Sequence, residues 1–69
     1  MNKSLFRITP RERQIIDLLC AGKADLEIAE TLGIAYKTVK AINYTLFRKL
    51  NVKSRAKLIY LMHQQRRFK

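Results

Sequence analysis

The sequence predicts a compact, all-α domain of four helices, and three observations support this prediction. Apolar residues recur at intervals of three and four, which is the helical period, rather than two. The two glycines and the single proline leave little room for long loops. The chain of 69 residues has the length of one small domain with a marginal core. We expect the helices at about residues 10–21, 25–32, 36–50 and 54–66.

Residues 1–8 are expected to form a lead-in to a domain that spans residues 9–66. The first helix has a clear start, because Thr9 supplies a capping hydroxyl and Pro10 suits the first helical position. Glu12 completes a capping box with Thr9, and Gly22 is placed to end the helix. The expected core residues of this helix are Ile15, Ile16, Leu18 and Leu19.

The second helix carries Asp25 and Glu27 at its N-terminal end, where the helix dipole favours acids. Its expected core residues are Ile28, Ala29 and Leu32. Only Gly33, Ile34 and Ala35 separate this helix from the third one. Two helices joined by so short a turn containing glycine predict a helix-turn-helix arrangement.

The third helix has two faces. An apolar stripe for the core consists of Val39, Ile42, Leu46 and Leu50. A second stripe, centred roughly 180° away at about 100° per residue, consists of Lys37, Lys40, Ala41, Tyr44 and Arg48. This outward face is basic and contains no acid, so it suits the major groove of DNA, which admits one α-helix. An ordinary solvated basic face is the alternative reading of this helix alone.

In the fourth helix Ser54 is expected to act as the cap, and the helix contains five consecutive apolar residues from Leu58 to Met62. Such a run points nearly all the way round a helix. We therefore expect a second copy or a partner domain to cover the side that the core does not use. The alternative is a well-buried closing helix with one exposed tyrosine. Residues 67–69 are expected to be a basic tail.

The charge is divided unevenly along the chain. Residues 1–36 contain five basic and five acidic residues, whereas residues 37–69 contain ten basic residues and no acid. Positive charge gathered in one half of a domain predicts a polyanionic partner, most simply nucleic acid. An anionic membrane surface is the alternative, because basic amphipathic helices also bind there.

The residue inventory argues against several classes of function. Cys20 is the single cysteine, so neither an internal disulfide nor a cysteine-based metal site is expected, and a core thiol suits a reducing cytoplasm. No stretch resembles a signal peptide or a membrane span. His63 is the single histidine and has no acidic or cysteine neighbour in sequence, so we expect no enzyme, metal or cofactor.

The chain resembles LuxR-type (GerE-type) helix-turn-helix domains, including those of NarL-like response regulators. The residues that match the family span about 50 of the 69 residues, with the spacing of the family throughout. The matching residues are Thr9 to Arg13, Ala21-Gly22, Glu27-Ile28-Ala29, Leu32, Ile34, Thr38-Val39-Lys40, Arg48-Lys49-Leu50, Val52 and Ser54-Arg55.

This resemblance implies a bacterial transcriptional regulator in the cytoplasm, near the nucleoid, that binds double-stranded DNA through its third helix. The residues in the base-reading positions are Lys40, Ala41 and Tyr44. The residues expected at phosphates, from the resemblance and from the charge pattern, are Lys37, Thr38, Arg48, Lys49 and Lys53. The fourth helix is implied to form a homodimer, and the expected interface residues are Leu58, Leu61, Met62 and Gln65.

The sequence departs from the family pattern at four places. Ile42 replaces a usual histidine, and Tyr44 replaces a frequent lysine in a base-reading position. Ala35 replaces the serine that usually caps the third helix, and Ala24 replaces a usual serine or threonine, so Asp25 is expected to cap the second helix. These departures leave the fold prediction intact but change the expected operator.

Two further binding classes remain open at this stage. One is a sigma-factor-like module that works with RNA polymerase, although the fourth helix and the block from Val52 to Arg55 argue against it. The other is a domain that binds a protein partner or a membrane. The sequence also leaves open whether the chain is an autonomous regulator or the effector domain of a larger one.

Overall fold

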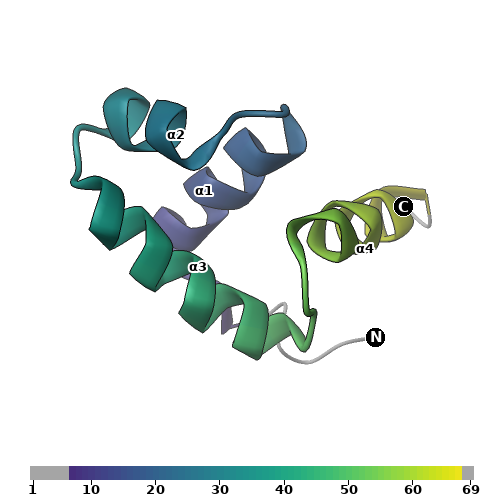
Figure 1. The fold of residues 1–69 in the computed structure, drawn as a ribbon. Helices are drawn as coiled ribbons and strands as arrows, with labels where there is room; N and C mark the ends of the chain where they lie inside the picture. The colour runs from purple at the N-terminus through teal and green to yellow at the C-terminus, as the bar shows by residue number, and fades with distance from the viewer. Residues whose placement is uncertain (1–6, 68–69) are drawn as a thin grey trace.

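The computed structural model describes residues 7–67, with the side chains of residues 7–65, and contains four helices (Figure 1). They are α1 (Pro10–Cys20), α2 (Asp25–Leu32), α3 (Tyr36–Leu50) and α4 (Arg55–Arg67). The described part of the chain contains no strand, so the predicted all-α class is confirmed. Most of the predicted lead-in (residues 1–6) and most of the predicted tail (residues 68–69) lie outside the described residues.

The predicted capping box opens α1. The backbone N–H of Glu12 donates to Thr9 Oγ1 at 3.1 Å, and the backbone N–H of Thr9 donates to Glu12 Oε1 at 2.9 Å. The helix ends at Cys20, one residue earlier than expected, because Ala21 is the C-cap and Gly22 takes a φ of 86°. That left-handed conformation is easiest for glycine and turns the chain toward α2.

The start of α2 corrects one expectation. Asp25 is not the cap: Ala24 holds that position, and its backbone N–H donates to Oε1 of Glu27 at 2.8 Å. The Asp25 side chain therefore remains available for contacts with other helices. Gly33 closes α2 in the left-handed conformation, and α3 begins three residues later without a side-chain cap at Ala35, as the sequence predicted.

The turn between α3 and α4 is also short, because only residues 51–54 separate the two helices. Asn51 is the C-cap of α3 with a φ of 55°, a conformation that asparagine tolerates better than most residues. The backbone N–H of Val52 then donates to the Phe47 carbonyl at 3.0 Å. Ser54 caps α4 as predicted, since its Oγ accepts the backbone N–H of Lys57 at 3.1 Å.

All four helices contribute to one core. Its buried apolar residues are Ile15, Ile16, Leu19, Ile28, Ala29, Val39, Leu46, Leu50, Leu58 and Met62. Leu18, Leu32 and Ile42, which were expected in the core, are only half-buried and pack against its edge. α3 instead buries Asn43, between Val39 and Leu46, so its core stripe contains an amide that the sequence prediction omitted.

The helices leave α3 with a long free side. α2 lies above α3 and α4 lies beyond its C-terminal end, while α1 passes behind (Figure 1). The outer side of α3 is therefore left uncovered by the other helices (Figure 1). None of the helices within residues 7–67 has the length and hydrophobicity of a membrane span.

Candidate nucleic-acid interface

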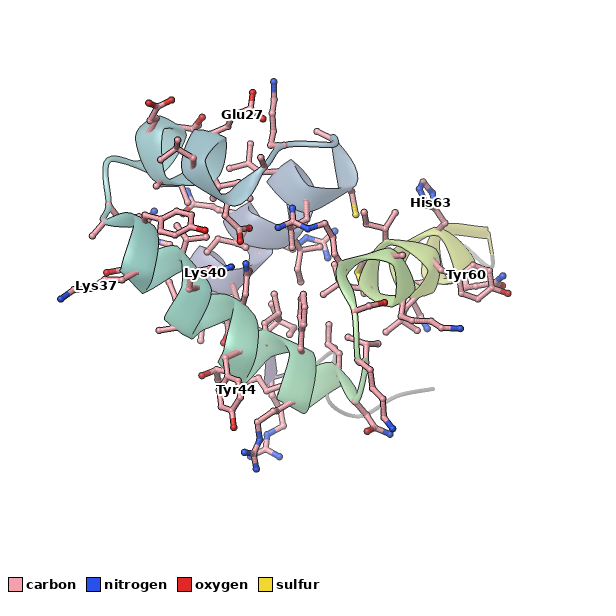
Figure 2. All side chains as sticks on the ribbon, viewed as in Figure 1. Glu27, Lys37, Lys40, Tyr44, Tyr60 and His63 are labelled. Carbon is pink, nitrogen blue, oxygen red and sulfur yellow. The ribbon has the colours of Figure 1, made fainter. Side chains whose placement is uncertain are left out.

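The outward face of α3 is exposed along its whole length. Its members Lys37, Lys40, Ala41, Tyr44 and Arg48 are all exposed, and so is Thr38 beside them. Figure 2 shows Lys37, Lys40 and Tyr44 on successive turns of α3. The structure thus brings the three expected base-reading residues together on one surface with three of the five expected phosphate-binding residues.

Two aromatic rings support cations on this face. The Nζ of Lys40 lies 5.5 Å from the centre of the Tyr36 ring, and the guanidinium carbon of Arg48 lies 5.6 Å from the centre of the Tyr44 ring. Arg48 Nη1 also donates to the Tyr44 hydroxyl at 3.0 Å. Each pair is spaced by four residues, so both follow from helix geometry. The tyrosines restrict where the two cationic groups can point.

A groove of about 610 Å³ runs between the start of α1 and the outward face of α3. Its lining residues are Thr9, Arg11, Glu12, Lys37, Thr38, Ala41, Ile42 and Thr45. Arg11 is exposed on α1 and adds a positive charge to the rim that the sequence analysis did not include in the interface. No periodic signal links α1 to α3, so only the tertiary structure identifies Arg11 as a neighbour of this face.

Lys49 lies differently from the other expected phosphate-binding residues. Its Nζ donates to Glu12 Oε1 at 2.8 Å and to the Arg7 carbonyl at 3.0 Å, and its side chain is half-buried. Burial raises the pKa of Glu12, but the hydrogen bonds from Lys49 and Thr9 and the charge of Lys49 outweigh it and lower that pKa. Lys49 thus joins α3 to the start of α1. Lys53 is exposed in the turn before α4.

A buried carboxylate lies beside the outward face. Asn43 Nδ2 donates to Asp25 Oδ1 at 3.0 Å, and the Arg55 guanidinium pairs with the same oxygen while its Nη1 donates to the Lys23 carbonyl at 3.0 Å. The other oxygen, Oδ2, lies 3.5 Å from Lys40 Nζ. These contacts join α2, α3 and the start of α4 around one acid.

The environment keeps Asp25 ionised. Burial raises its pKa, but Arg55 opposes this through a hydrogen bond and its charge, and Asn43 and Lys40 add to the opposition, so the pKa falls below its ordinary value. Asn43 Oδ1 is buried and has no hydrogen-bond partner among the described residues. The amide group therefore contributes to this site as a donor.

The expected dimer interface on α4 requires a correction. Leu58 and Met62 have exposed fractions of only 0% and 4%, because they point into the core of their own chain. Leu61 and Gln65 are half-buried, and Tyr60 is the exposed large apolar residue of this helix. The apolar run from Leu58 to Met62 had no period that distinguished its inner side from its outer side. Tyr60 and His63 lie on the side of the molecule away from Lys37 (Figure 2).

No group of three histidine, cysteine or acidic side chains suitable for a metal occurs within residues 7–67. The site therefore consists of α3, which is basic and exposed and is the second helix of a helix-turn-helix pair. Residues 7–62 match the family described as bacterial regulatory proteins, luxR family, or GerE. The chain belongs to the LuxR family.

Curated relatives agree with this assignment. The transcriptional regulatory protein MctR of Rhizobium johnstonii is 46% identical over 52 residues, which are 75% of this chain and 24% of MctR. The transcriptional regulatory protein TdiR of Thauera aromatica is 40% identical over 58 residues, or 84% of this chain and 26% of TdiR. The nitrate/nitrite response regulator protein NarL of Escherichia coli K12 is 37% identical over 62 residues, or 90% of this chain and 29% of NarL.

The chain spans about a quarter of the length of these relatives. What it shares with them is the DNA-binding helix-turn-helix domain of LuxR-family transcriptional regulators, a family that is not enzymatic. The family match includes most of α4. The predicted resemblance is thereby confirmed.

Proposed function

We propose that this chain binds double-stranded DNA sequence-specifically, with α3 in the major groove, as the DNA-binding part of a bacterial transcriptional regulator. One observation carries the proposal: α3 presents an exposed, acid-free face that carries Lys37, Lys40 and Arg48. α3 is also the second helix of a helix-turn-helix pair, the position that reads bases in this arrangement. The LuxR-family membership supports the same conclusion independently.

The base-reading residues are proposed to be Lys40, Ala41 and Tyr44. Lys40 supplies an ammonium donor for the O6 and N7 acceptors of guanine. Ala41 lies between the two on the exposed face, and its small side chain permits close approach to a thymine methyl group. Tyr44 provides a ring for apolar contact, while its hydroxyl accepts a hydrogen bond from Arg48.

Phosphate contacts are proposed from Lys37, Thr38, Arg48 and Lys53, with Arg11 added on the rim of the groove between α1 and α3. Such contacts set the register of the protein on DNA without reading sequence. Lys49 was expected in this set as well. Because its ammonium already has two acceptors within the protein, we propose that its direct contact with phosphate is weaker than that of Lys53.

Dimerisation is proposed through the outer side of α4. Tyr60, with an exposed fraction of 63%, and the half-buried Leu61 and Gln65 provide a surface for a second copy. Two copies related by a two-fold axis would read two half-sites of an operator. A second copy in this position leaves the DNA-facing side of α3 open, because Tyr60 lies on α4, away from Lys37 (Figure 2).

The experiment that tests the proposal is selection of binding sites from random duplex DNA at two salt concentrations. Enrichment of a short motif, especially a two-fold repeat, is the expected result. Strongly salt-dependent binding without a motif would contradict sequence-specific recognition by this chain. Absence of binding even at low salt would overturn the proposal and direct the search to protein partners.

A further inference from the structure

A second hollow lies next to the proposed base-reading face. This cleft of about 270 Å³ is lined by Asp25, Lys40, Asn43, Tyr44, Phe47 and Arg55. Lys40 and Tyr44 are two of the three proposed base-reading residues, and Asp25 and Asn43 are buried beneath them. A negative charge is therefore built in directly behind a surface proposed to meet a polyanion.

The contact between Asp25 and Lys40 is the weak one of the cluster. Asp25 Oδ1 is held by Asn43 and Arg55, whereas Oδ2 faces Lys40 Nζ at 3.5 Å, beyond the usual length of a charge-assisted hydrogen bond. The Lys40 side chain is 57% exposed and that of Asp25 only 10%. An ion pair with one exposed partner exchanges readily when a better acceptor arrives.

The carboxylate tolerates the loss of Lys40. Removing the sole partner of a buried charge is strongly destabilising, but Asp25 retains the Arg55 guanidinium and the Asn43 amide when Lys40 moves away. Lys40 reaches from α3 by a flexible four-carbon stem, so its ammonium can leave the cleft without a change of the backbone. Lys40 can therefore adopt two arrangements, one paired with Asp25 and one released from it.

We propose that Asp25 is a specificity-determining residue. Its ion pair with Lys40 keeps the Lys40 ammonium away from phosphates, and the pair opens when a guanine edge accepts a hydrogen bond from that ammonium. The proposal rests on the function proposed above. On a random sequence Lys40 remains with Asp25 and adds no phosphate contact. On the correct sequence the O6 and N7 acceptors take the ammonium at short range in the groove. Asp25 thereby weakens binding to random DNA more than binding to the operator.

The test compares Asp25→Asn with the parent chain on the selected operator and on a random duplex, each at several salt concentrations. Asparagine keeps the shape of the side chain and removes its charge. We expect the affinity for random DNA to rise by up to about fivefold, as for release of an exposed ion pair. On random DNA the slope of log affinity against log salt concentration should steepen by about 0.9, the value for one added phosphate contact. The ratio of operator affinity to random-DNA affinity should fall.

Two controls separate this effect from bulk charge. Asp17→Asn removes the same charge from an exposed position on α1, where Asp17 pairs with Arg13, and should leave the ratio unchanged. In a Lys40→Met background, Asp25→Asn should no longer change the ratio. Equal effects of Asp17→Asn and Asp25→Asn on the ratio would overturn the proposal, as would an Asp25→Asn effect that persists without Lys40.

A measurement on the parent chain covers the case in which Asp25→Asn unfolds. Nuclear magnetic resonance of the lysine ammonium groups should report Lys40 still paired in the complex with random DNA and released in the complex with the operator. An identical Lys40 signal in both complexes would overturn the proposal. If the selection experiment yields no motif, the proposed function fails; if it yields a motif and the ratio is insensitive to Asp25→Asn, only the role of Asp25 fails.

Discussion

The ammonium of Lys49 lies 2.8 Å from the Glu12 carboxylate, so a lysine in the last turn of α3 is bound to the first turn of α1. The side chains are 28% and 8% exposed, which makes this pair less accessible to water than an ordinary surface pair. Glu12 also accepts the Thr9 backbone N–H. One carboxylate therefore both caps α1 and attaches it to the proposed recognition helix.

Lys49→Met is expected to lower the free energy of unfolding by about 1–3 kcal/mol, because it leaves a largely buried carboxylate without its cation. Urea unfolding followed by circular dichroism measures the change. Arg13→Met is the matched control, since it breaks the exposed pair with Asp17 and should cost about 0–1 kcal/mol. Equal losses in the two variants would show that the Lys49 pair contributes no more than a surface pair.

Stability is expected to fall in acid, and the sign follows from two carboxylates. Glu12 and Asp25 have pKa values lowered from the ordinary 4.5 and 3.8, so the unfolded chain takes up protons first as the pH falls. Their contribution is complete above those ordinary values and is lost progressively below them. Urea midpoints between pH 6 and pH 2.5 measure this loss. The double variant Glu12→Gln, Asp25→Asn should show a flatter profile, and an unchanged profile would assign the loss to other groups.

Lys40→Ala is expected to weaken binding to the selected operator by about 1–3 kcal/mol and to relax the preference at one base position. Lys37→Ala should instead weaken binding to all duplexes alike and reduce the salt slope by about one. Fluorescence anisotropy on the operator and on single-base variants distinguishes the two patterns. Lys57→Ala, an exposed change on α4, is the control. A Lys40→Ala variant with full affinity and unchanged base preference would place Lys40 outside the groove.

Leu58→Ala and Leu61→Glu are expected to act differently although both change α4. Leu58 is fully buried, so Leu58→Ala should lower the free energy of unfolding by about 2–5 kcal/mol. Leu61 is half-buried beside the exposed Tyr60, so Leu61→Glu should chiefly prevent paired occupancy of two half-sites on DNA. Unfolding curves and gel shifts on one or two half-sites measure these effects. Normal cooperative occupancy with Leu61→Glu would locate the interface elsewhere.

The sequence predicted the features that depend on local chemistry. The capping box at Thr9 and Glu12, the stop at Gly33 and the cap at Ser54 are confirmed because neighbouring residues determine each of them. The bounds of α2 and α3 match the prediction for the same reason. The outward face of α3 followed from helical periodicity, and its members are exposed as expected.

The features that the sequence missed depend on contacts between helices. From sequence alone Asn43 has the character of a polar surface residue. The fold places Asp25, 18 residues earlier, opposite its amide. Lys49 reads as one more outward cation, although the position of α1 directs it to Glu12. Leu58 and Met62 belong to an apolar run with no period, so only packing against the other helices shows which side is buried. In each case the partner lies on another helix, beyond the reach of a local pattern.

The Asn43 amide also fixes the axial position of α3. In a purely apolar stripe, a shift of one helical turn, about 5.4 Å, brings another apolar side chain to each core position. Such a shift would separate Asn43 from Asp25, and the freed carboxylate and amide would lose the partners that burial demands. In the proposed complex, the depth at which Lys40 and Tyr44 would enter a groove is therefore set when the chain folds, before any DNA is present.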